Sequence, residues 1–305
     1  MTRAIRRTKK TMSNSPEQII DTSLLVERKR RAARRAVAGA DFLMARAADD
    51  LAERLATVGR RFAKAAALFC VTPAGRDAVL ASGKVDEAVR IETDAAFLGD
   101  EAGIVAVPGH VPLAPDSIDL AVSLLSLQDE NDIPGMLIQI RRALKPDGLF
   151  LGAMAGAGTL AELRESLLAA EAELSGGASP RIVPFADVRE MGALLQRAGF
   201  ALPVADVETV TLRYATMFDL MADLRAMGAA NPLSGRSRRP ATRQLFARAA
   251  RIYEERFSDP DGRIRATFSF IWMSGWAPDV SQPKPLRPGS ADISLAKILG
   301  ESKDK

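Results

Sequence analysis

Short, continuous apolar runs recur along this 305-residue chain and constrain its fold more than any other feature. The first run is Ala65-Ala66-Ala67-Leu68-Phe69-Cys70-Val71. Runs of this length without polar alternation are typical of strands buried on both faces of a parallel sheet. The predicted strands are 65–71, 88–91, 103–107, 118–127, 149–154, 204–214 and 264–276. Because helix-compatible or turn segments separate most of them, we expect an α/β fold with a Rossmann-like, doubly wound, mostly parallel seven-stranded sheet.

Apolar residues at helical spacing occupy most of the remaining chain. The segment 24–67 is dense in Ala, Leu, Arg and Glu, which predicts two N-terminal helices. A further helix is expected over 132–144, and Lys145-Pro146-Asp147-Gly148 should end it in a turn. Later helices are expected near 187–198, 217–227 and 241–257.

A helical cap is predicted over about 157–200. Thr159 and Glu162 have the spacing of a capping box, in which each side chain bonds the backbone of the other residue. Leucines then form one apolar stripe, and Ser175-Gly176-Gly177 should end the helix. The stripe consists of Leu160, Leu163, Leu167, Leu168 and Leu174. A loop with prolines follows, and together these segments are expected to cover a site.

The composition excludes several kinds of chemistry. Cys70 is the only cysteine and His110 the only histidine, so an intramolecular disulfide, a cysteine-clustered metal site and a histidine-based triad are ruled out. We expect no metal site, a buried apolar role for Cys70 and a solvated loop position for His110. Hydrophobic residues make up 47% of the chain, yet no apolar run approaches the roughly 18 residues of a membrane span.

Positive charge is concentrated near the N-terminus. The chain carries a formal charge of +4, and residues 1–15 are basic and free of acids. Either an organelle transit peptide or a start codon assigned upstream of Met12 explains this segment. The first alternative predicts the mitochondrial matrix and the second a bacterial cytoplasm. A second basic cluster, 27–35, is expected to be a solvated helix face.

The chain is expected to form one main domain over 24–277, between a basic segment, 1–23, and a Pro-rich tail, 278–305. Nucleic-acid binding is not expected, because no recognition motif accompanies the N-terminal charge.

Two segments resemble strands four and five of the type 11 S-adenosylmethionine-dependent methyltransferases. They are 115–127 and Leu144-Lys145-Pro146-Asp147-Gly148-Leu149-Phe150, with an amphipathic helix between them. Further blocks are similar to the complex I assembly factors of this fold and their bacterial relatives. These blocks are 24–61, 158–164, 176–181, 194–200 and 220–228. The resemblance implies S-adenosylmethionine as cofactor and a respiratory-chain subunit or assembly factor as partner, with methylation or arginine hydroxylation as the chemistry.

The resemblance also implies where the cofactor would bind. The family places a Gly-x-Gly-x-Gly turn after strand one, an acid after strand two that bonds the ribose, and an Asp after strand three that bonds the adenine. The matching positions here are Val71, Thr72, Gly75, Glu92, Val107 and Leu124. Of these, Gly75 and Glu92 keep the family's residue type, and Asp94 is a second candidate for the acid. Pro73 removes one amide donor from the turn.

Substrate-side candidates follow from the same resemblance. Gln128 lies where relatives often carry His-Trp, and Arg164, Arg181 and Tyr214 lie in blocks that match the family. Two functions remain open at this point. One is a methyltransferase-like enzyme that modifies a protein acceptor, and the other is a noncatalytic assembly or chaperone-like factor that keeps the fold without the cofactor.

Overall fold

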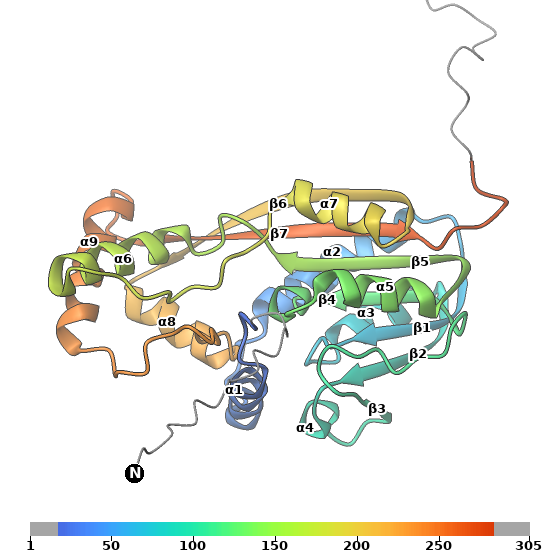
Figure 1. The fold of residues 1–305 in the computed structure, drawn as a ribbon, viewed down its shortest axis with the longest axis horizontal. Helices are drawn as coiled ribbons and strands as arrows, with labels where there is room; N and C mark the ends of the chain where they lie inside the picture. The colour runs from blue at the N-terminus through green and yellow to red at the C-terminus, as the bar shows by residue number, and fades with distance from the viewer. Residues whose placement is uncertain (1–17, 284–305) are drawn as a thin grey trace, which may run out of the picture.

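Seven strands form one sheet in the order β3-β2-β1-β4-β5-β7-β6 (Figure 1). The computed structural model describes residues 18–283, so most of the expected basic N-terminus and Pro-rich tail lie outside the described residues. The strands are β1 (Phe62–Leu68), β2 (Val85–Glu92), β3 (Gly103–Val105), β4 (Ile118–Leu124), β5 (Leu144–Ala155), β6 (Ala201–Tyr214) and β7 (Ile264–Trp276). β7 runs antiparallel to both β5 and β6, and the other neighbouring pairs are parallel. The doubly wound, mostly parallel fold is therefore confirmed.

Helices cover both faces of this sheet. They are α1 (Thr22–Arg35), α2 (Phe42–Thr57), α3 (Ala74–Ala81), α4 (Ala95–Leu98), α5 (Ile133–Ala143), α6 (Ala161–Ser175), α7 (Val188–Arg197), α8 (Met217–Ala226) and α9 (Arg243–Phe257), with a 3-10 turn at Leu127–Asp129. One core joins α2, α3, α6, α8 and α9 to one face. A second core joins α5 and α7 to the opposite face. The sheet is thus the middle of three layers.

The alternation of side chains along β1 explains why this strand has no polar residue after Lys64. Ala65 and Ala67 belong to the core under α2 and α3, whereas Ala66 and Leu68 belong to the core under α5. All four side chains are buried. Successive strand residues face opposite sides of a sheet, so a strand covered on both sides must be apolar throughout.

The antiparallel strands β6 and β7 extend well beyond the parallel part of the sheet (Figure 1). Their extension carries α6, α8 and α9 at one end of the molecule, where α6 packs on α9. Helix α7 packs on β6 and next to α5 instead. Within the expected cap 157–200, α6 and α7 therefore lie on opposite faces of the sheet.

Two expectations about where elements begin and end are wrong. The helical segment 24–67 was expected to overlap the strand predicted from residue 65, but α2 ends at Thr57 and β1 already begins at Phe62, where the chain enters the sheet beside Val85. The expected turn at 145–148 belongs to β5, which continues through a bulge opposite β4. There Asp147 takes the left-handed conformation of the bulge, and its N–H donates to the Ala277 carbonyl, so the strand continues past this residue.

The capping box expected at Thr159 and Glu162 does not form. The Thr159 hydroxyl donates to the Ser269 carbonyl at 3.1 Å and accepts from the Ser269 N–H at 3.0 Å. Glu162 likewise accepts from Thr267. Both side chains therefore join the start of α6 to β7. The leucine stripe is also only partly buried, since Leu168 and Leu174 are about 40% exposed.

Within residues 18–283, none of the helices combines the length and apolar character needed to cross a membrane.

Candidate functional site

The strand order reverses between β1 and β4, and a crevice opens at the carboxyl ends of these strands. Ligands of doubly wound folds bind at this kind of switch point. A cavity of about 770 Å³ lies there. Its walls come from the loop after β1, the segment after β4, α1 with the loop into α2, the start of α6 and the end of α8. The topology therefore places the cavity where the fold usually binds its ligand.

The turn after β1 has left-handed backbone at two residues that are not glycine. Phe69 has φ of +58° and Val71 has φ of +65°. This conformation is rare for residues other than glycine and is strained for a β-branched one. The turn thus keeps a backbone that favours glycine although its residues are bulky. Val71 and Thr72 both line the cavity, and the buried Thr72 Oγ1 has no hydrogen-bond partner among the described residues.

Gly75 serves close packing at the start of α3. A Cβ built on Gly75 would lie 3.3 Å from Cys70 Sγ and 3.3 Å from Leu124 Cδ1. Leu124 itself is fully buried, and neither Gly75 nor Leu124 lines the cavity. Cys70 is buried as expected, and burial raises the pKa of its thiol to about 12.

Glu92 is the last residue of β2, as expected, but its carboxylate is bonded within the protein. Glu92 Oε2 accepts from the Val71 N–H at 3.1 Å, and Glu92 Oε1 pairs with Arg90 at 3.2 Å. Arg90 also donates to the carbonyls of Val71 and Phe97 and pairs with Glu101 at 2.8 Å. Glu92 is only 1% exposed, and burial raises its pKa to about 7. The acid does not line the cavity.

Asp94, the second candidate acid, joins α1 to α4. Its carboxylate accepts from the Ala96 N–H at 2.9 Å, which caps α4, and it forms an ion pair with Arg30 of α1. A smaller cavity of about 320 Å³ lies between α1 and this region, with Pro108 on its wall. Val107, which follows β3, is 72% exposed and lines neither cavity. Helix α1 therefore covers the side of the crevice next to β2.

Two of the four substrate-side candidates line the large cavity. Gln128 donates to the Leu125 carbonyl at 2.6 Å and accepts from the Ala155 N–H at 3.3 Å. Arg181 forms an ion pair with Glu171 at 2.7 Å. Both polar groups are thus already bonded within the protein.

The other two candidates lie off the cavity. Arg164 donates to the Val183 carbonyl at 3.1 Å. Tyr214 is half-buried, and burial, with Asp223 as a smaller cause, raises the pKa of its hydroxyl. His110 is exposed, as expected.

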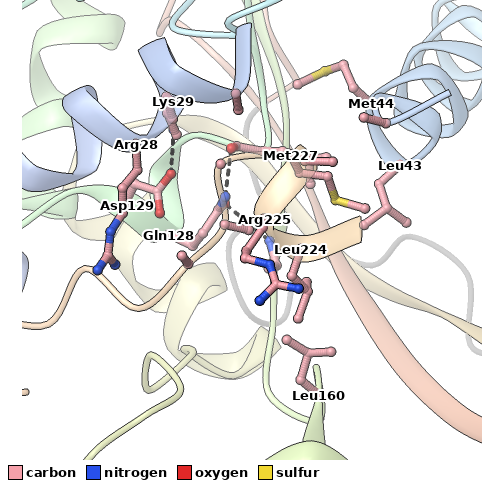
Figure 2. A pocket seen from close by; sticks show the side chains of 18 of the residues that line it. Arg28, Lys29, Leu43, Met44, Gln128, Asp129, Leu160, Leu224, Arg225 and Met227 are labelled. Atoms are coloured by element: carbon pink, nitrogen blue, oxygen red, sulfur yellow. Dashed lines mark hydrogen bonds and ion pairs between the residues drawn. The ribbon is translucent and has the colours of Figure 1, made fainter. Parts of the chain in front are cut away.

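Several cavity residues were missed because the basic cluster 27–35 was expected to be fully solvated. That expectation is wrong for Arg28 and Lys29, which line the cavity, although Arg31, Arg34 and Arg35 are exposed. Lys29 forms an ion pair with Asp129 at 2.6 Å, and Figure 2 shows this pair beside Arg28 on one side of the pocket. The helical spacing could have indicated that Lys29 faces the protein, because the apolar Leu25 lies one turn before Lys29 on the same helix face. Leu25 is buried.

Comparison with known proteins agrees with this fold. Residues 78–152 match the sequence profile of the type 11 methyltransferase domain. The arginine-hydroxylase NDUFAF5 of Danio rerio is 42% identical over 195 residues, which cover 64% of this chain and 60% of the relative. The malonyl-[acyl-carrier protein] O-methyltransferase of Laribacter hongkongensis is 36% identical over 59% of this chain and 58% of the relative. The chain thus spans about 60% of the length of these relatives.

A solved structure supports the fold alone. The YcgJ protein of Bacillus subtilis superposes with a TM-score of 0.51 at 13% identity, covering 77% of this chain and 99% of the other. The resemblance to the methyltransferases that rests on the segments after β3 is therefore confirmed.

Proposed function

We propose that this chain, a methyltransferase-like protein with a type 11 methyltransferase domain in residues 78–152, is a noncatalytic assembly factor for a respiratory-chain complex. It keeps the fold of its relatives and replaces the usual cofactor contacts with internal bonds. The observation that carries the proposal is the bonding of Glu92 to Val71 and Arg90.

The residues at the family's contact points do not fit S-adenosylmethionine in its usual position. The ribose acid must offer two free oxygens to the ligand, but both oxygens of Glu92 are bonded inside the protein. The turn after β1 must let backbone amides approach the ligand, but the side chains of Val71 and Thr72 stand on the cavity wall. The side chain of Val107 offers no acceptor for the adenine amine. Each lost contact costs roughly 1–3 kcal/mol of binding, so the affinity would fall by orders of magnitude.

The partner class follows from the resemblance. The similarity to the complex I assembly factors over α6, α7 and α8 supports a respiratory-chain subunit or another assembly factor as partner. The relatives named as mitochondrial support a mitochondrial location. We assign the matrix if residues 1–15 are a transit peptide and a bacterial cytoplasm otherwise.

A second function, transfer of a methyl group from S-adenosylmethionine to a protein acceptor, has one observation in its favour. Phe69 and Val71 keep left-handed backbone in the turn where the family has glycines. Under this alternative the Arg90–Glu92 pair would have to open before the cofactor could bind.

Calorimetric titration with S-adenosylmethionine separates the two functions. We expect the wild-type protein to give no saturable heat with S-adenosylmethionine at concentrations up to about 1 mM. A dissociation constant above about 1 mM corresponds to a binding free energy weaker than about 4 kcal/mol. The Val71→Gly/Thr72→Gly variant, which restores open backbone, should bind more tightly than wild type. Micromolar binding by the wild type that Glu92→Ala abolishes would overturn the proposal and support methyl transfer. Capture of the native protein should also recover respiratory-chain subunits, and their absence would contradict the assembly role.

A further inference from the structure

The large cavity is mostly apolar, and its apolar side chains come from nearly every element around it. Representative residues are Leu25 of α1, Met44 of α2, Leu163 of α6, Leu224 of α8, Phe246 of α9 and Phe268 of β7. A volume of about 770 Å³ falls within the range of small-molecule sites. Water gains few hydrogen bonds against such walls, so an apolar occupant is favoured.

Most polar groups on the cavity wall already have partners. The Thr159 hydroxyl is bonded to Ser269, the Gln128 amide to backbone groups, and Arg181 to Glu171. An apolar ligand would leave these groups satisfied, so it would not incur the cost of orphaned hydrogen bonds. A nucleoside would instead need an acceptor for its ribose hydroxyls at the end of β2, and Glu92 does not line the cavity.

The charges on the cavity wall are unbalanced. Of its four cationic side chains, Lys29 pairs with Asp129 and Arg181 pairs with Glu171. Within residues 18–283, Arg28 and Arg225 have no carboxylate within 4.0 Å. Figure 2 shows Arg225 in the middle of the pocket near Leu224, with Arg28 to one side. Two guanidinium groups without acidic partners, beside an apolar interior, match a ligand with one anionic end.

The surroundings of Arg28 strengthen this argument. Its guanidinium is partly buried and donates to the Asn231 carbonyl. Burial lowers its pKa, and the nearby charges of Arg236 and Arg31 lower it further, although Asp21 and Glu27 act in the opposite direction. A bound anion would relieve this repulsion, so the site is better satisfied with the anion present.

We propose that the cavity binds a free long-chain carboxylate, with its alkyl chain among the apolar side chains and its carboxylate on Arg28 and Arg225. This inference goes beyond the proposed function.

The test titrates the full chain with palmitate and, separately, with methyl palmitate, using displacement of a fluorescent fatty acid as readout. Palmitate should bind saturably, and its uncharged ester should bind about tenfold or more weakly, because a charge-assisted bond to arginine is lost. Binding should tighten about two- to fourfold for each methylene added from octanoate upward until the cavity is filled.

Arg28→Met and Arg225→Met keep much of the apolar stem and remove the charge. Each should weaken palmitate binding by about tenfold without changing the binding of the ester. Arg35→Met is the matched control, because Arg35 lies on the same helix, is exposed, does not line the cavity and is not among the charges that act on Arg28. Thermal unfolding of each variant confirms that it is folded.

Three outcomes would overturn the proposal. Equal affinity for palmitate and its ester would exclude the arginine contacts, and an affinity independent of chain length would exclude the apolar cavity. Binding to phosphatidylglycerol vesicles without binding of free palmitate would assign the basic surface to membranes instead. Failure of S-adenosylmethionine to bind bears only on the cofactor, so the two proposals fail separately.

Discussion

The carboxylate of Glu92 accepts a hydrogen bond from the backbone N–H of Val71 at 3.1 Å, which fastens the end of β2 to the turn that follows β1. Arg90 completes the arrangement with an ion pair to the same carboxylate, and both charged side chains are at most 2% exposed. A position that the fold uses for ligand binding thus has a structural role in this chain.

Removal of Glu92 should therefore destabilise the fold. Glu92→Ala leaves Arg90 buried with Glu101 as its remaining carboxylate partner and leaves the Val71 N–H without an acceptor. We expect the free energy of unfolding at pH 8 to fall by about 3 kcal/mol, the usual cost of breaking a buried ion pair. Urea denaturation at pH 8 measures this change in the free energy of unfolding. Glu87→Ala on the same strand is the control, since Glu87 is exposed and should change stability by less than about 0.5 kcal/mol. Equal effects of the two substitutions would contradict a structural role for Glu92.

Stability should also fall as the pH rises from about 4.5 to about 7. Burial raises the pKa of Glu92 to about 7, and burial followed by the neighbouring Asp129 raises that of Glu130 to about 7. In this interval the unfolded chain has released these protons while the folded protein still holds them, so deprotonation favours unfolding. Urea denaturation at pH 5 and pH 7.5 should show the loss, and Glu130→Gln should reduce it. A rise in stability over this interval would refute the assignment.

Much of the fold could be predicted from the sequence because burial on both faces leaves a strong pattern. Runs such as 65–71 and 149–154 have no polar alternation, and only a sheet covered by helices on both sides accommodates them. The ends of elements were less predictable. The segment 58–67 continues the Ala-rich composition of α2, yet pairing with β2 makes it a strand from Phe62 onward.

The site was less predictable, because residue type does not determine where a side chain points. Glu92 was correctly expected at the end of β2, but its bonding to Val71 depends on the neighbouring turn. The left-handed backbone at Phe69 and Val71 contradicts the usual preference of such residues, so tertiary packing must impose it. Arg28 and Lys29 were assigned to solvent because charged helix residues usually lie there, whereas α1 in fact lies across the crevice.

The Thr159 hydroxyl joins the start of α6 to β7 through its bonds to Ser269, so its removal should destabilise the fold. Thr159→Val preserves the shape of the side chain but leaves the buried Ser269 N–H without an acceptor. We expect a loss of about 2 kcal/mol in the free energy of unfolding. Thr159→Ser keeps the hydroxyl and should lose less. A loss for Thr159→Val no larger than the loss for Thr159→Ser, which keeps the hydroxyl, would contradict a stabilising hydrogen bond between Thr159 and Ser269.

Because the turn after β1 is strained, substitution of Val71 by glycine should change the free energy of unfolding little. At Val71, with φ of +65°, glycine removes a backbone strain of roughly 1–2 kcal/mol and adds about 0.5–1 kcal/mol of unfolded-state entropy. Val71→Gly should therefore leave the free energy of unfolding within about 1 kcal/mol of wild type. Val79→Gly in α3 is the comparison, because Val79 is 1% exposed and helical, and its loss should cost about 3 kcal/mol or more. Urea denaturation of both variants checks the contrast. A cost at Val71 as large as that at Val79 would mean that the left-handed turn stores no strain and that the valine side chain stabilises the fold through packing.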